Sequence, residues 1–178
     1  MIGGGGCAWP KHAASKHRDL RIDVIEEDAC IIDIARRYFF VGDLEKAGAL
    51  RLIAAEGRSY LERTAQTYDA ILNDAFSGTE PARGLATVEA AQAIARKLNP
   101  GGIYLSNVVS RGRGSDLSFL CDTAATLREV FATVQVIPCP DSEYSDEDNF
   151  LVAATDGPLH LEGGLPCNDA FPGTPQYD

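Results

Sequence analysis

Four consecutive glycines, Gly3 to Gly6, stand at the start of this chain, and an acid, Glu26, follows about 20 residues later. A glycine loop lets the backbone turn tightly and approach a ligand closely, because no Cβ is in the way. Glu26 ends the predicted strand 21–26, where a carboxylate can accept hydrogen bonds from ribose hydroxyls. Glycine loop, helix, strand and acid in this order are typical of a nucleotide-binding β-α-β unit.

Acids also follow the next two predicted strands. Glu56 comes after the strand 49–55, and Asp74 comes after the strand 68–73. Glu56 can accept from an adenine amino group, or it can be an acid favoured by the dipole at the start of a helix. Asp74 can belong to the same site, or it can cap the turn at Ser77-Gly78. Because successive strand ends carry glycines or acids, we favour a functional site over chance.

The elements that must position these residues alternate between strand and helix. Helical spacing of apolar residues predicts helices over 10–17, 29–39, 59–64, 88–98 and 115–131, with Asp28 and Ser59 as N-caps. Strands are predicted over 21–26, 49–55, 68–73, 103–109, 133–137 and 149–154, and Met1-Ile2 forms a truncated first strand. This order predicts an α/β fold: a doubly wound, mostly parallel seven-stranded sheet with an antiparallel last hairpin. Such a sheet resembles the Rossmann-like methyltransferase fold of S-adenosylmethionine-dependent enzymes.

Composition excludes several classes of protein. The net charge of -10 argues against nucleic acid as a partner. No apolar run approaches the roughly 20 residues that a membrane helix needs, and the N-terminus lacks a signal peptide. Five scattered cysteines without zinc spacing predict reduced thiols in a cytoplasmic protein, with no metal. We expect one domain over 1–156 and a poorly ordered, Pro/Gly-rich tail over 157–178.

The sequence of the predicted site is similar to that of a known family. I-G-G-G-G at 2–6, V-I-E-E-D-A-C-I-I-D-I-A-R-R-Y-F at 24–39, L-I-A-A-E-G-R-S-Y-L at 52–61 and Y-D-A-I-L-N-D-A-F-S-G-T-E-P at 68–81 resemble the spermidine synthase family of polyamine aminopropyltransferases. The resemblance covers residues 2 to about 155. It implies a transferase of polyamine biosynthesis that moves an aminopropyl group from decarboxylated S-adenosylmethionine to an amine.

The resemblance also implies a role for each matching residue. The nucleoside would be held by Gly3, Gly4, Gly5 and Glu26, the adenine would contact Glu56 and Gly57, Pro81 would line the co-substrate site, and Asp74 would be the catalytic base.

Two acids of the family are replaced in this chain. Gly6 stands where the glycine motif continues with an aspartate that binds the diamine, and Ser77 occupies the substrate-binding position of a second aspartate. A buried ammonium without a partner costs several kcal/mol, so we expect an acceptor other than putrescine bound in the usual way. The family also carries a β-hairpin domain before the first strand, which helps to build dimers. We therefore expect a truncated chain or a wrong start site, and a homodimer remains open.

Two other functions fit the same residues. The first is a methyltransferase on this scaffold that uses S-adenosylmethionine itself, which the loss of the two diamine-binding acids favours. The second is a non-catalytic module that binds a nucleoside or a partner without chemistry.

Overall fold

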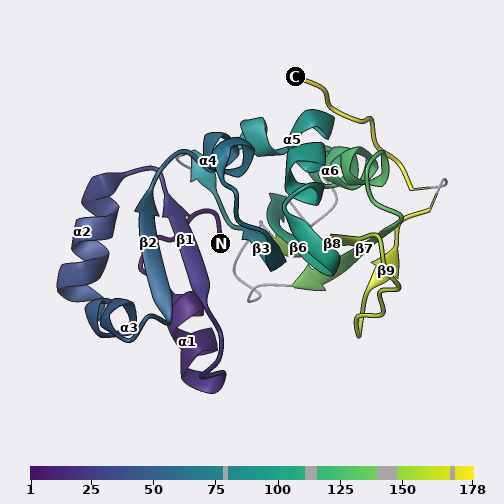
Figure 1. The fold of residues 1–178 in the computed structure, drawn as a ribbon. Coiled ribbons are helices and arrows are strands. Elements are labelled where there is room, and N and C mark those ends of the chain that lie inside the picture. The colour runs from purple at the N-terminus through teal and green to yellow at the C-terminus, as the bar shows by residue number, and fades with distance from the viewer. Residues whose placement is uncertain (78–79, 111–115, 140–147, 169–170) are drawn as a thin grey trace. The chain divides into compact units, whose positions relative to one another are not determined.

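The computed structural model describes residues 1–77, 80–110, 116–139, 148–168 and 171–178 (Figure 1). Contacts between Cα atoms divide the chain into two compact units. We call Met1–Arg63 the N-terminal unit and Thr64–Asp178 the C-terminal unit. The boundary falls inside the segment 1–156, which the sequence predicts to be one domain.

The N-terminal unit is built on two parallel strands, β1 (Ile22–Glu26) and β2 (Leu50–Ala54). Ile2 forms a single parallel bridge with Ile25 at the position of the predicted truncated first strand. The helices of this unit are α1 (Ala8–Lys16), α2 (Ala29–Tyr38), α3 (Gly42–Lys46) and α4 (Gly57–Arg63). The prediction of Asp28 as an N-cap is confirmed, because its Oδ1 accepts from the Cys30 backbone N–H at 2.7 Å.

The core of the N-terminal unit is formed by residues of β1, β2 and the helices. Burial of these apolar side chains is the main force that holds the strands and helices together. The buried cluster consists of Cys7, Ala13, Ile22, Val24, Ile32, Ala35, Val41, Leu50 and Leu52. Val24 and Val41 are fully inaccessible to solvent, so the strand that ends at Glu26 is anchored by the centre of this core.

The C-terminal unit contains a five-stranded mixed sheet. Its strands are β3 (Tyr68–Asn73), β6 (Leu98–Ser110), β7 (Thr133–Cys139), β8 (Asp148–Thr155) and β9 (Leu165–Pro166), in the order β3-β6-β8-β7-β9. β3 pairs in parallel with β6, and the other pairs are antiparallel. The predicted antiparallel pairing of the last two predicted strands is confirmed as β7 and β8. A short ribbon, β4 (Phe76–Ser77) with β5 (Glu80–Pro81), and β9 are additions that the sequence pattern does not predict.

Helices α5 (Val88–Ala95) and α6 (Ser118–Arg128) pack against each other and against β6 (Figure 1), and the 3-10 turn η1 (Arg83–Leu85) precedes α5. α5 ends three residues before the predicted Leu98, and residues 99–102 belong to β6 rather than to a helix stop. Gly101 has a φ of 77°, and the pairing of β3 with β6 changes register between Tyr68 and Ala70. The glycines therefore form an irregularity within the strand. Ser115, the predicted start of α6, lies outside the described residues.

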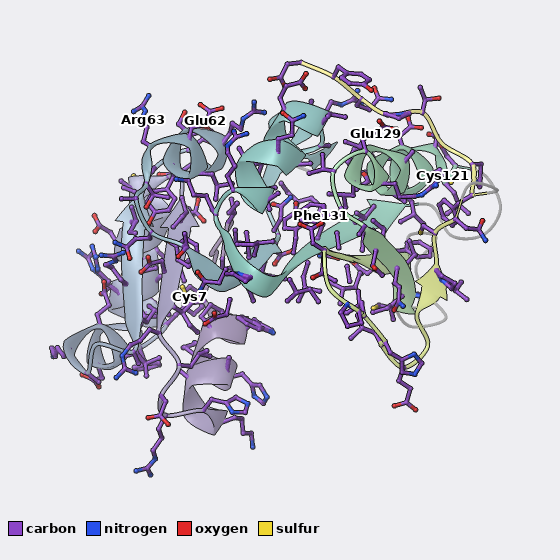
Figure 2. All side chains as sticks on the ribbon, turned by 45° about the vertical axis from the view of Figure 1, so that its right-hand side comes forward. Cys7, Glu62, Arg63, Cys121, Glu129 and Phe131 are labelled. Carbon is purple, nitrogen blue, oxygen red and sulfur yellow. The ribbon has the colours of Figure 1, made fainter. Side chains whose placement is uncertain are left out.

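The buried centre of this unit includes a stacked aromatic pair. The rings of Tyr104 and Phe131, the second of which is labelled in Figure 2, lie 6.4 Å apart and are inclined by 10°. Burial raises the pKa of the Tyr104 phenol, although hydrogen bonds with Ser106 and Asn73 act in the opposite direction. The hydroxyl of Tyr104 is thus a neutral hydrogen-bonding group within the core.

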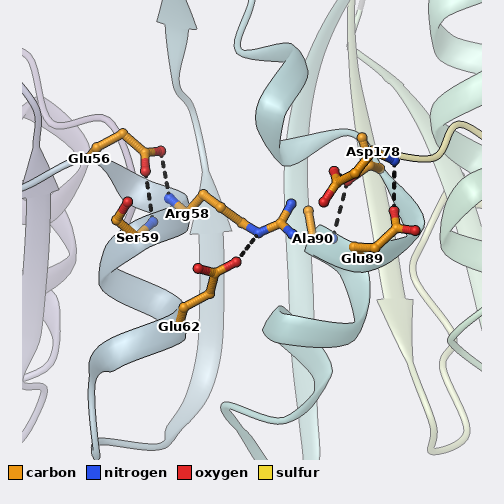
Figure 3. A network of polar contacts seen from close by, with 8 residues as sticks. Glu56, Arg58, Ser59, Glu62, Glu89, Ala90 and Asp178 are labelled. Atoms are coloured by element: carbon orange, nitrogen blue, oxygen red, sulfur yellow. Dashed lines mark hydrogen bonds and ion pairs between the residues drawn. The ribbon is translucent and has the colours of Figure 1, made fainter.

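The end of the chain, residues 174–178, contacts α5 and α6. The N–H of Val88 at the start of α5 donates to the Gln176 carbonyl at 2.8 Å, and the Gln176 N–H donates to Thr126 Oγ1 at 3.0 Å. The Asp178 N–H donates to Glu89 Oε2 at 3.0 Å (Figure 3). The end of the chain therefore has defined hydrogen-bond partners, although the composition of 157–178 predicts poor order. Across the described parts of both units, no helix has the length and apolarity that crossing a membrane requires.

Candidate functional site

The glycine loop joins the Ile2 bridge to α1. Gly3 has a φ of 80° and Gly5 a φ of 46°, in the left-handed region that favours glycine. A Cβ added to Gly4 would lie 2.5 Å from Val24 Cγ1, closer than two carbon atoms can approach. The loop therefore needs glycine at these positions for conformation and for space, as the sequence predicts.

Glu26 lies against this loop, at the end of β1. Its Oε2 accepts from the backbone N–H groups of Gly4 at 3.0 Å and Gly5 at 3.2 Å, and its Oε1 accepts from the Asp28 N–H at 3.2 Å. An ionised carboxylate has about four acceptor positions. Glu26 can thus fix the shape of the loop and still accept a hydrogen bond from a ribose hydroxyl.

The residues that follow the loop are structural or exposed. Cys7, labelled in Figure 2, is 1% exposed, and desolvation raises the pKa of its thiol, with Glu26 and Glu45 adding to the increase and Lys11 opposing it. A raised pKa leaves little thiolate, so Cys7 acts as a small buried side chain. The Trp9 side chain is 50% exposed and is not part of the core.

Glu56 caps α4, and the prediction that Ser59 does so is wrong. The two carboxylate oxygens of Glu56 accept from the N–H groups of Arg58 and Ser59, each at 2.7 Å (Figure 3). Desolvation raises the pKa of Glu56, but these bonds and the Arg58 charge outweigh it, so the pKa lies below its usual value. The helix begins at Gly57, and Glu62, which we paired with Ser59 in a capping box, instead binds Arg58 at 2.7 Å. The contact of Glu56 with adenine stays a prediction.

Asp74 follows β3 in the C-terminal unit and is partly exposed. Its Oδ1 accepts from Asn107 Nδ2 at 2.8 Å. Asn73, the residue before it, donates through Nδ2 to the Tyr104 hydroxyl at 3.0 Å and accepts from the Ala75 N–H at 3.2 Å. The carboxylate is therefore held by β6 on one side, and the backbone around it is held by Asn73.

The remaining predicted residues of this unit lie in the ribbon after Asp74. Ser77 of β4 pairs with Glu80, and Phe76 pairs with Pro81 of β5. The side chains of Ser77 and Pro81 lie outside the described part of the chain, so their contacts with a ligand stay predictions.

Sequence reasoning missed Asn107, which lies within β6 and donates to the Asp74 carboxylate. A polar residue in the predicted strand 103–109 was the available signal. Among the described residues, no group of histidine, cysteine, aspartate or glutamate side chains could hold a metal ion.

The model of the spermine/spermidine synthase domain matches residues 1–155. The chain belongs to this family. A polyamine aminopropyltransferase from Vibrio vulnificus is 30% identical over 134 residues, which are 74% of this chain and 42% of that protein. Spermidine synthase 2 from Arabidopsis thaliana is 28% identical over 133 residues, which are 74% of this chain and 38% of that protein. The chain thus spans less than half the length of these relatives.

Solved structures agree with this assignment. A probable spermidine synthase from Corynebacterium glutamicum superposes with a TM-score of 0.78 and 27% identity, over 89% of this chain and 56% of that one. Human methyltransferase-like protein 13 in complex with SAH superposes with a TM-score of 0.70 and 22% identity, over 92% of this chain and 72% of that one. The second likeness shows the fold alone. The predicted α/β, Rossmann-like methyltransferase fold is confirmed.

Proposed function

We propose that this chain carries the co-substrate-binding and catalytic part of an aminopropyltransferase. It would transfer the aminopropyl group of decarboxylated S-adenosylmethionine to an amine. Membership of the spermine/spermidine synthase domain family supports the class of reaction. The observation that carries the proposal is the Asp74 carboxylate, which Asn107 holds at 2.8 Å beside the end of β3.

The chemistry follows from the charge on the acceptor. A primary amine has a pKa near ~10, so it arrives protonated and must lose a proton before it can attack. The Asp74 carboxylate would attract the ammonium, orient it and accept that proton. The nitrogen lone pair then forms a bond to the aminopropyl carbon beside the sulfonium. The carbon–sulfur bond breaks, its electrons remain on sulfur, and a neutral thioether nucleoside leaves.

The N-terminal unit would hold the nucleoside. The N–H groups of Gly4 and Gly5 fix the Glu26 carboxylate, which keeps an acceptor position for a ribose hydroxyl. Glu56 already accepts two backbone hydrogen bonds, and it would use a remaining acceptor position for the adenine amino group. Glu26 is therefore the residue on which we expect affinity for the nucleoside to depend most.

The acceptor would differ from a diamine bound in the usual way. A Cβ on Gly6 would lie 3.7 Å from the Phe39 ring, so the space at this position is already bounded by an aromatic side chain. Neither Gly6 nor Ser77 can neutralise a second ammonium. We therefore propose an acceptor with one amino group at Asp74 and no cationic group at the far end.

Product formation tests this proposal directly. The purified protein is incubated with decarboxylated S-adenosylmethionine and a panel of monoamines and diamines, and the released thioether nucleoside is measured by chromatography. We expect turnover with monoamines, and a fall of roughly 10²–10⁴-fold in kcat for Asp74→Asn, the range for a lost general base. Asp69→Asn is the matched control, because Asp69 is an exposed acid on the same strand. Equal turnover by Asp74→Asn and the wild type would refute the role of Asp74.

Methyl transfer is the second candidate function. It is favoured by the replacement of both diamine-binding acids and by the fold shared with methyltransferase-like protein 13. In this reaction S-adenosylmethionine itself would be the donor, and S-adenosylhomocysteine would be released. Detection of that product with S-adenosylmethionine, and of none with the decarboxylated form, would select this alternative.

A further inference from the structure

A small cavity lies in the C-terminal unit, lined in part by Asn73 of β3 and Asn107 of β6. Its volume is about 20 Å³. None of its lining residues has a charged side chain, and its polar lining comes from Asn73, Thr87, Tyr104, Ser106, Asn107, Thr123 and Thr126. A cavity holds a water molecule when it offers at least about 10–15 Å³ and two to four polar partners. This cavity meets both conditions.

Thr123 of α6 supplies the strongest indication of a ligand. The residue is 6% exposed, and its Oγ1 has no hydrogen-bond partner among the described residues. Thr126, three residues further along the same helix, instead donates to the Asp122 carbonyl at 2.7 Å. A buried hydroxyl without a partner loses its hydration with no compensation, so native proteins rarely leave one unsatisfied.

Several polar groups of the cavity already bind one another. The two hydrogens of Asn73 Nδ2 reach Tyr104 Oη at 3.0 Å and Ser106 Oγ at 3.5 Å, and its Oδ1 accepts from the Ala75 N–H. The Tyr104 and Ser106 hydroxyls accept these bonds, so their own hydrogens are not used by Asn73. Hydrogens of this pair and the hydroxyl of Thr123 are therefore available to a ligand in the cavity.

We propose that the cavity is a binding site for one ordered water molecule. The two lone pairs of the water accept from the Thr123 hydroxyl and from the Tyr104–Ser106 pair, and one of its hydrogens is available to the carbonyl oxygen of Asn107. The water thereby connects α6 to Asn107 of β6. With its side-chain carbonyl oxygen bound to the water, Asn107 keeps Nδ2 in the orientation that donates to Asp74.

Thr123 is on this basis a positioning residue for Asp74, acting through the water and Asn107. This positioning role rests on the proposed function, whereas the presence of the water does not. Loss of the water would free the Asn107 amide to rotate, and the Asp74 carboxylate would be held less firmly. We expect an effect on kcat rather than on the binding of the nucleoside.

Two variants of Thr123 test the site. Thr123→Val removes the hydroxyl and keeps the shape of the side chain, and Thr123→Ser keeps the hydroxyl. A high-resolution crystal structure of the wild type should show one water within hydrogen-bond distance of Thr123 Oγ1 and Ser106 Oγ. The Tm of Thr123→Val should fall by roughly 2–4 °C, because the water loses a partner, and Thr123→Ser should retain the water. A dry cavity in the crystal, or a Tm that rises in Thr123→Val because an orphan hydroxyl has been removed, would overturn the proposal.

Kinetics separate the positioning role from a merely structural one. We expect Thr123→Val to lower kcat by about tenfold, less than the roughly hundredfold cost of a full 1 Å misplacement, with KM for the nucleoside unchanged. Thr123→Ser should restore kcat. A wild-type kcat in a Thr123→Val protein that has lost the water would refute the positioning role. If the wild type proves inactive, the crystal structure and the Tm still decide whether the water site exists.

Discussion

Gly4→Ala probes the close approach on which the glycine loop depends. The new Cβ would lie 2.5 Å from Val24 Cγ1, about 1 Å short of ordinary contact between carbon atoms. Val24 is fully buried in the core, so neither side can move without cost. Overpacking of this kind destabilises a protein by typically about 1–3 kcal/mol. At roughly 2–4 °C per kcal/mol for a chain of this size, we expect a decrease in Tm of roughly 2–12 °C.

The same substitution should weaken nucleoside binding. If the loop moves away from Val24, the Gly4 and Gly5 N–H groups lose their bonds to Glu26, and the carboxylate is no longer held for a ribose hydroxyl. Differential scanning fluorimetry and calorimetric titration measure the two effects. Gly42→Ala is the matched control, because a Cβ there meets nothing within 4 Å. A Gly4→Ala protein with wild-type Tm and wild-type affinity would show that this reasoning about the loop is wrong.

Three further predictions follow from single contacts. Glu56→Ala should lower the free energy of unfolding at pH 7 by about 0.5–1 kcal/mol, a partial cap effect for an exposed carboxylate. The folded state lowers the pKa of Glu56. The difference in unfolding free energy between the variant and the wild type should therefore be full above about pH 4.3 and vanish as the pH falls through the folded pKa. Asn107→Ala should reduce kcat by roughly tenfold with unchanged nucleoside affinity in steady-state assays, and an unchanged kcat would exclude its support of Asp74. Deletion of residues 174–178 removes the Gln176 contacts with α5 and α6 and should lower the Tm by roughly 2–4 °C, whereas an unaltered Tm would mean that the tail does not pack in solution.

The fold could be predicted where local pattern and burial agree. The strand over Tyr68–Asn73 has the bounds that the sequence predicts, and α2 begins after the predicted cap Asp28. The apolar residues of β1 are buried on both sides, as expected for a strand covered by helices. The antiparallel last hairpin followed from two strands with no helix between them.

Elements that depend on distant partners could not be predicted. β9 exists because Leu165 and Pro166 pair with β7, about 30 residues earlier in the chain, in a segment without periodicity. The sequence predicts a helix stop at residues 99–102, but they lie within β6, between Leu98 and Ile103, which both pair with β3. The cap of α4 is Glu56 rather than the predicted Ser59, because the Glu56 carboxylate can accept from two backbone N–H groups at once.

The residues of the candidate site could be predicted from their types and order, but the residues that hold them in place could not. The glycine loop and Glu26 are brought together by the structure, as their order in the chain suggests. Asn107 lies 33 residues after Asp74, and this spacing does not predict their contact. The sequence around Thr123 predicts only a helix, and its burial without a hydrogen-bond partner is known only from the structure.

Calorimetric titration of the wild type with decarboxylated S-adenosylmethionine and with S-adenosylmethionine tests the proposed function most directly. Glu26→Gln and the exposed neighbour control Glu27→Gln are titrated beside it, after thermal unfolding has shown that each variant is folded. Aminopropyl transfer predicts tighter binding of the decarboxylated form, weakened in Glu26→Gln and unchanged in Glu27→Gln. Tighter binding of S-adenosylmethionine itself, or no binding of either compound by the folded wild type, would contradict it.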